Sequence, residues 1–286
     1  MRLILLFSCL DKPGLVAQLS SFVYEHGGNI HSLDEHVNSH LDGGESHFFI
    51  RIEWSVTEPQ YTLTKLESAF SVLVKDCNAT WKIRDKDKKL RIAIFVSKYD
   101  HCLREILWRH QAGELAVEIP LIISNHNDLS DIATQHGIAF RVFPMNREMK
   151  LEQENKECEL LDSHNIDTVV LARYMQVLSP EFVQRYKNQI INIHHSFLPA
   201  FIGSDPYKQA YERGVKIIGA TSHYVTSDLD EGPIIEQDIA RISHRESRED
   251  LIRKGRDVER LVLIRALEAH CNHRVLVSGC KTIVFS

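Results

Sequence analysis

Residues 192–196, Asn-Ile-His-His-Ser, combine residue types and a spacing that suit acyl chemistry. They end an apolar run from Ile190 that has the composition of a β-strand. Because successive side chains of a strand point to opposite faces, Asn192 and His194 are expected to point the same way. An amide and an imidazole side by side at the end of a strand can donate hydrogen bonds to a developing oxyanion. The pattern therefore predicts an oxyanion site at this pair.

A second polar segment follows a strand expected over residues 216–225. Three acidic residues precede a Gly-Pro turn there: Asp228, Asp230 and Glu231. Acidic residues in such a turn are typical of a solvated loop. The alternative is a carboxylate that acts as a general base. The general-base interpretation is favoured because the Asn192–His194 pair is expected on a neighbouring element.

The elements that must position these residues form two groups. Residues 1–84 show the βαββαβ order of a ferredoxin-like domain. Asp11 is expected to cap the first helix, with Pro13 in its first turn. Asp42-Gly43-Gly44 is a hairpin signal. The charge run at 85–89 is expected to be a linker.

Residues 90–286 alternate between strands and helices, which predicts an α/β fold with a doubly wound, mostly parallel, Rossmann-like sheet. In such sheets ligands bind outside the carboxyl ends of the strands, where Asn192 and His194 are expected. A hairpin around Gly279 is expected to end the chain. Strands are expected over 90–97, 116–124, 139–144, 167–173, 189–194, 216–225 and 234–241, and helices over 100–112, 127–136, 148–163, 179–186 and 246–270.

Together these segments resemble the formyltransferase family that uses 10-formyltetrahydrofolate. In that family an Asn-x-His pair and the Asp of a Leu-Asp-x-Gly-Pro segment form the catalytic trio. The resemblance implies Asn192, His194 and Asp230 as that trio. Residues 171–180, Leu-Ala-Arg-Tyr-Met-Gln-Val-Leu-Ser-Pro, are similar to the family's pterin-contacting segment. The implied substrate-binding residues are Met175, Gln176, Val177, Leu178, His223 and Thr226.

The N-terminal domain resembles an ACT domain, a module that binds small amino acids where chains meet. The resemblance rests on Asp-Lys-Pro-Gly-Leu at 11–15 and Gly-Gly-Asn-Ile at 27–30. It implies a homo-oligomer and an amino-acid effector, for which we expect glycine or methionine. Capping and turn geometry explain the first segment equally well. The implied effector-binding residues are Asp11, Gly14, Asn29 and Ile30.

An ACT domain joined to this catalytic domain resembles the hydrolytic branch of the family. The segment after the first strand of this domain points the same way. A transformylase needs a Gly-rich turn after the first strand to hold its nucleotide phosphate, and Lys98–Cys102 contains no glycine. Water is then the expected acceptor, and folate is the substrate with no separate cofactor. Two alternatives stay open: a formyl transferase with an unidentified amine acceptor, and a non-enzymatic amino-acid sensor.

Composition and residue spacing argue against several other classes of protein and of site. A net charge of −5 argues against a general nucleic-acid binder, and no apolar run reaches the ~20 residues that span a bilayer. The six scattered cysteines indicate free thiols in a reducing cytoplasm. We predict no catalytic metal, because the histidines lack compact spacing with Cys or carboxylate partners. Arg173 is expected in a surface ion pair, Asp205 at a helix start, and His223 either beside Asp230 or in the core.

Overall fold

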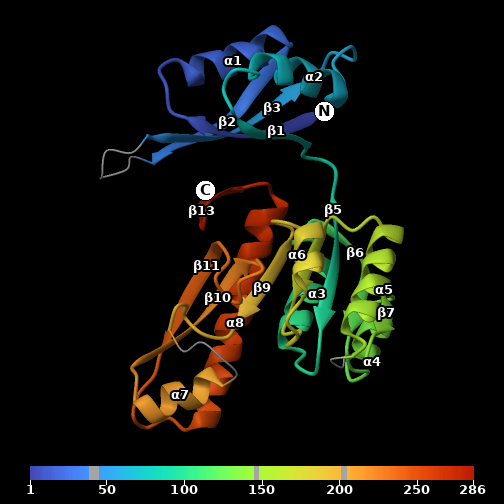
Figure 1. Ribbon diagram of the computed structural model, residues 1–286, viewed down its shortest axis with the longest axis vertical. Coiled ribbons are helices and arrows are strands. Elements are labelled where there is room, and N and C mark those ends of the chain that lie inside the picture. Colours follow the sequence, from blue (N-terminus) through green and yellow to red (C-terminus); the bar gives the residue numbers. More distant parts are fainter. Residues whose placement is uncertain (39–44, 145–147, 201–204) are drawn as a thin grey trace. The chain divides into compact units, whose positions relative to one another are not determined.

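The structure is a computed structural model that describes residues 1–38, 45–144, 148–200 and 205–286. The chain divides into two compact units, shown in Figure 1. The first comprises Met1–Lys88 with Asn272–Leu276 and Ile283–Ser286, and the second comprises Lys89–Cys271 with Val277–Thr282. The sequence pattern predicted a single domain over residues 90–286. The last segments belong instead with the first unit, because Leu276 and Phe285 pack against its strands.

The first unit has one antiparallel sheet in the order β2-β3-β1-β4. Its elements follow the expected βαββαβ order, and the two helices cover one face of the sheet (Figure 1). Alternate residues of the central strand serve the two faces: Leu5 and Phe7 contact the helices, and Leu6 contacts the C-terminal residues. The elements are β1 (Arg2–Leu10), α1 (Leu15–Glu25), β2 (Gly28–Asn38), β3 (His47–Val56), α2 (Leu63–Leu73) and β4 (Thr80–Asp85).

The start of α1 differs from the expected one. The residue before the helix is Gly14, whose φ of 90° lies in the left-handed region, and its N-terminus has no side-chain cap. Asp11 instead donates its backbone N–H to the Ser46 carbonyl oxygen at 2.8 Å. The prediction that Asp11 caps the helix is therefore wrong, because a glycine turn starts the helix later. The expected Asp42-Gly43-Gly44 turn lies outside the described residues.

The second unit is built on a seven-stranded sheet in the order β11-β10-β9-β8-β5-β6-β7. Five adjacent strands of this order are parallel to one another: β9, β8, β5, β6 and β7. By contrast, β10 pairs antiparallel with β9, and β11 pairs antiparallel with β10. The mostly parallel sheet was predicted, but the two antiparallel strands were not. The elements are β5 (Leu90–Val96), α3 (His101–Gln111), β6 (Val117–Ser124), α4 (Ser130–Gln135), β7 (Ala139–Val142), α5 (Lys150–Ser163), β8 (Thr168–Leu171), α6 (Pro180–Arg185), β9 (Ile190–His194), α7 (Pro206–Arg213), β10 (Ile217–Tyr224), β11 (Ile234–Arg241), α8 (Arg248–Cys271), β12 (Val275–Ser278) and β13 (Lys281–Val284).

Helices cover both faces of this sheet. Ala93 and Phe95 of β5 lie in one core cluster with residues of α5 and α6. Ile92 and Ile94 alternate with them and are fully buried, so they face the opposite side. Helices α3 and α8 pack against each other, and α8 also contacts β9, β10 and β11. The sheet is thus doubly wound, and the carboxyl ends of its parallel strands lie at one edge.

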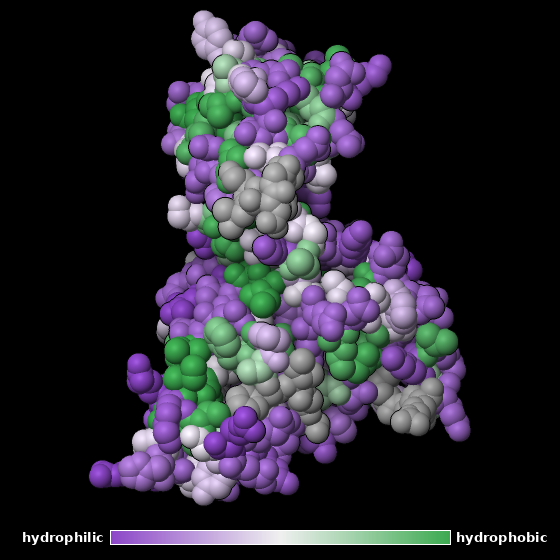
Figure 2. All heavy atoms as spheres, turned by 60° about the vertical axis from the view of Figure 1, so that its left-hand side comes forward, coloured by the Kyte–Doolittle hydropathy of each residue, from purple (hydrophilic) through white to green (hydrophobic). Residues whose placement is uncertain are grey.

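The polarity of the surface and the state of the cysteines agree with the composition of an ordinary globular protein. On the face shown in Figure 2, hydrophilic residues predominate and hydrophobic residues form separate areas between them. All six cysteines are free. Within the described ranges, no helix combines the length and the apolar character that crossing a membrane requires.

Candidate active site

Asn192, His194 and Asp230 come together at the end of β9. His194 Nδ1 lies 3.3 Å from an Asp230 carboxylate oxygen, and His223 Nε2 lies 3.7 Å from the same oxygen. Asn192 Nδ2 lies 3.2 Å from His223 Nε2. The antiparallel pairing of β9 with β10 causes this, because it sets His223 directly opposite Asn192. His223 is therefore part of the cluster, which the sequence left undecided.

The loop after β10 brings Asp230 back toward the strand end. Asp230 itself has a φ of 58°, in the left-handed region that Asp tolerates better than most residues. Gly232 follows, and a Cβ at this position would lie 1.7 Å from the Tyr224 carbonyl oxygen. The Tyr224 N–H also donates to the Pro233 carbonyl oxygen at 2.9 Å. Only a residue without a side chain permits this close return, which fixes the position of the carboxylate.

The Asp230 carboxylate is held in its ionised form. Burial alone would raise the pKa of Asp230, but the adjacent imidazoles of His194 and His223 lower this pKa well below its usual range. With Nδ1 facing Asp230, the Nε2 atom of His194 is buried and has no hydrogen-bond partner among the described residues. A carboxylate that orients one imidazole nitrogen leaves the other free to move a proton.

A cavity of about 60 Å³ opens beside this cluster. Asn192, His223 and Asp230 are the members of the cluster that line it. Of the predicted substrate-binding residues, Gln176, Val177, Leu178, His223 and Thr226 line it. Met175 is half-exposed and is not among the lining residues. The remaining lining residues are Leu171, Val225, Ser227, Asp228 and Leu229.

Arg173 does not form the surface ion pair expected from the sequence. Its side chain is buried, and one guanidinium nitrogen lies 3.2 Å from a Glu259 oxygen. His101 Nε2 lies 2.8 Å from the same carboxylate, and the Tyr207 hydroxyl donates to it at 2.5 Å. Several cations and donors around one buried carboxylate keep the pKa of Glu259 below its usual value, although burial opposes this. We call these four residues the Glu259 network.

Sequence reasoning missed the Glu259 network because Glu259 lies in a long, highly charged helix. A charged residue in such a helix usually faces water. One signal was present in Gly255, a glycine in the helix interior, where it lowers helix stability. A Cβ at Gly255 would lie 2.0 Å from the Tyr207 hydroxyl oxygen. The glycine therefore marks the approach of α7 to α8 that brings Tyr207 to Glu259.

His195 lies between this network and the Asp230 cluster, with its ring centroid 5.3 Å from that of His194. Its ring centroid lies 5.9 Å from that of Tyr207. Burial and the nearby Arg173 charge lower the pKa of His195 to about 4. The two adjacent histidines thus differ in role: His194 contacts a carboxylate, and His195 is a neutral imidazole at physiological pH.

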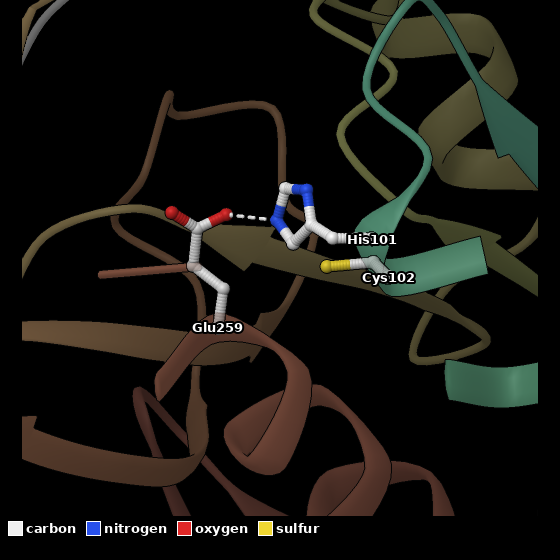
Figure 3. A group of neighbouring side chains, drawn as sticks. All are labelled: His101, Cys102 and Glu259. Atoms are coloured by element: carbon white, nitrogen blue, oxygen red, sulfur yellow. Dashed lines mark hydrogen bonds and ion pairs between the residues drawn. The ribbon is translucent and has the colours of Figure 1, made fainter. Parts of the chain in front are cut away.

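Three neighbouring side chains, drawn in Figure 3, are of residue types that can bind a metal ion. The candidate ligand atoms of His101, Cys102 and Glu259 lie within 4.8 Å of one another. Their surroundings disfavour a cation. Arg173 already neutralises Glu259, and burial raises the pKa of the Cys102 thiol well above its usual value. A metal would have to displace the arginine and deprotonate a buried thiol.

The predicted effector residues lie in two places of the first unit. Asp11 and Gly14 are exposed in the segment between β1 and α1. Asn29 is exposed on β2, and Ile30 packs partly against the core. β2 is an edge strand of its sheet. Their role in binding an effector stays a prediction.

Known proteins resemble this chain, which combines a doubly wound sheet, an Asn-x-His pair at the end of a strand and an Asp in the loop after the next strand. Residues 90–267 match the family described as formyl transferase, and the chain belongs to that family. A glycinamide ribonucleotide transformylase from Symbiobacterium toebii is 28% identical, with a TM-score of 0.65, over 69% of this chain and 95% of the other. That similarity leaves nearly a third of the chain unmatched.

Other relatives match the whole length. The formyltetrahydrofolate deformylase of Synechocystis sp. is 54% identical over 282 residues, which cover 99% of this chain and 98% of the relative. The crystal structure of a formyltetrahydrofolate deformylase from Pseudomonas syringae is 44% identical with a TM-score of 0.95, and the match covers 100% of this chain and 95% of the other. Within its family, the chain groups with the formyltetrahydrofolate deformylases.

Proposed function

We propose that this protein hydrolyses 10-formyltetrahydrofolate to formate and tetrahydrofolate, with the folate as substrate and no cofactor. Full-length similarity to formyltetrahydrofolate deformylases supports the reaction. Formate released in this way would supply purine synthesis and balance one-carbon pools. The free thiols agree with a cytoplasmic setting.

The observation that carries hydrolysis over transfer lies after β5. A nucleotide acceptor would need backbone N–H groups to bind its phosphate there. Instead the Asp100 carboxylate lies at the N-terminus of α3, paired with Arg104. Beside it, three side chains of the Glu259 network contact the Glu259 carboxylate. The Arg173 guanidinium lies 5.0 Å from the centre of the Tyr99 ring. A carboxylate at the helix terminus repels phosphate, so water remains as the acceptor.

The cluster around Asp230 provides the groups that hydrolysis requires. Asp230 orients His194 through Nδ1, and His194 Nε2 takes a proton from water as its oxygen bonds to the formyl carbon. One N–H of Asn192 faces His223 at 3.2 Å, and its second N–H donates to the oxyanion. The tetrahedral intermediate then collapses. The C–N10 bond breaks, and the proton on His194 passes to N10.

A formate-release assay tests the proposal. Purified protein is incubated with 10-formyltetrahydrofolate and no amine, and formate and tetrahydrofolate are both quantified. Equal amounts of the two products at a catalytic rate are expected. Release that depends on an added amine would establish a transferase instead, and folate binding without turnover would establish a sensor.

We further propose that the first unit is an ACT domain with Asp11, Gly14, Asn29 and Ile30 at an amino-acid site. The exposed β1–α1 segment and the edge strand β2 support this, since edge strands pair readily with a second copy. A homo-oligomer that binds glycine or methionine is expected. Light scattering and calorimetry with each amino acid test it, and a monomer that binds neither would contradict it.

A further inference from the structure

The substrate-contacting segment between β8 and α6 is fastened by two buried glutamates of α5. At its start, the Tyr174 hydroxyl donates to a Glu157 carboxyl oxygen at 3.1 Å. At its end, the Ser179 backbone N–H donates to a Glu154 carboxyl oxygen at 3.0 Å. Both glutamates are buried, with exposed fractions of 0% and 3%. Between these anchors lie Gln176, Val177 and Leu178, which line the cavity.

The segment needs anchoring because its backbone is strained. Arg173 and Met175 have φ values of 64° and 58°, in the left-handed region that side chains disfavour. Such residues persist only when their surroundings fix them. Tyr174, between them, supplies that constraint: its ring packs edge-on against Phe95 at 5.1 Å, and the Ser97 hydroxyl donates to its carbonyl oxygen. The Glu157 bond holds the far end of the same side chain.

Ser179 gives the other end a fixed direction. Its hydroxyl accepts a hydrogen bond from the Phe182 N–H at 3.2 Å and so caps α6. Its own N–H would otherwise be buried without a partner, which costs stability. The Glu154 carboxylate satisfies that N–H. Both ends of the segment are therefore hydrogen-bonded to the same helix, α5.

We propose that Glu157 and Glu154 are positioning residues that shape the folate-binding wall through Tyr174 and Ser179. The proposal rests on the proposed function, because it assumes that the cavity holds the folate. It predicts that disturbing the anchors changes the KM for 10-formyltetrahydrofolate and leaves kcat nearly unchanged. The reacting groups lie on β9 and after β10, away from both anchors in the chain.

The charge state of Glu157 gives the proposal a second readout. Burial, reinforced by the Glu154 charge, raises the pKa of Glu157 to about 8, although the Tyr174 hydrogen bond opposes the rise. The neighbouring Cys158 faces Arg185 of α6 and Asp162 of its own helix. Because the pKa is raised in the folded state, the ordered segment is favoured at lower pH. It loses this contribution as the pH rises through about 8.

The test compares KM and kcat at pH 7 and pH 9 for four proteins: wild type, Tyr174→Phe, Glu157→Gln and the control Tyr186→Phe. Tyr186 bonds Asp162 of the same helix at 3.3 Å but lies outside the segment. At pH 7 we expect Tyr174→Phe to raise KM about 5-fold, the factor that one hydrogen bond supplies. Glu157→Gln keeps an acceptor for Tyr174 and should stay within about 2-fold of wild type.

At pH 9 the wild-type KM should rise at least about 3-fold over its value at pH 7, since Glu157 is then mostly ionised. Glu157→Gln should lack this rise, because an amide does not ionise. An unchanged KM in Tyr174→Phe, or the same alkaline rise in both proteins, would overturn the inference. Wild type that releases no formate would instead refute the proposed function, so the two failures are distinguishable.

Discussion

Replacing Asp230 by asparagine isolates the charge on which the proposed mechanism depends. Asp230→Asn preserves the size of the side chain but removes the carboxylate that faces His194 and His223. When His194 takes a proton, it becomes an imidazolium whose Nδ1 lies 3.3 Å from this carboxylate. At an effective dielectric constant of ~20, that attraction is about 5 kcal/mol. An asparagine provides none of it, and its amide can also hold His194 in the wrong tautomer.

We therefore expect Asp230→Asn to lower kcat about 10³-fold, within the range typical of general acid–base catalysis. KM should change much less, because the cavity keeps its other lining residues. The assay is formate release at saturating 10-formyltetrahydrofolate. Glu231→Gln is the matched control: it makes the same charge change at the next residue, which is exposed. A kcat within about threefold of wild type in Asp230→Asn would refute the role of the Asp230–His194 pair.

Three further substitutions test other parts of the site. Asn192→Ala should lower kcat about 10²- to 10³-fold through loss of an oxyanion donor, and an effect on KM alone in the formate assay would contradict that role. Gly232→Ala should lower kcat strongly, because its Cβ would meet the Tyr224 carbonyl oxygen at 1.7 Å and displace the Asp230 loop; wild-type kcat would show that the loop return is unimportant. Glu259→Gln should lower the free energy of unfolding by about 3 kcal/mol, since it leaves the buried charge of Arg173 unpaired. Urea denaturation measures this loss, and an unchanged midpoint would argue against the Glu259 network.

Local patterns predicted much of the second unit. Alternation along β9 placed Asn192 and His194 on one face, and the structure brings both into the same cluster. Asp205 was assigned to a helix start, and it caps α7 by accepting the Lys208 N–H at 3.1 Å. Such features depend on a few neighbouring residues, so the sequence contains their causes.

Features set by distant residues were not predicted. The antiparallel pairing of β10 with β9 decides that His223 faces Asn192, and no local pattern encodes it. Arg173 was expected at the surface because its partner Glu259 is 86 residues away. Glu157 likewise reads as one more charged residue of a polar helix, although it is fully buried. Burial of a charged residue depends on which other elements cover it.

The Glu259 network consists of residues other than those proposed to break the bond. The residues proposed to break the bond are Asn192, His194 and Asp230. The residues proposed to exclude an amine acceptor belong to the β5–α3 turn and to α8, where His101 contacts Glu259. A change in Tyr99 or His101 can therefore alter which nucleophile reaches the formyl group without touching the groups that break the bond. The proposed choice between water and an amine therefore depends on different side chains from those proposed to break the bond.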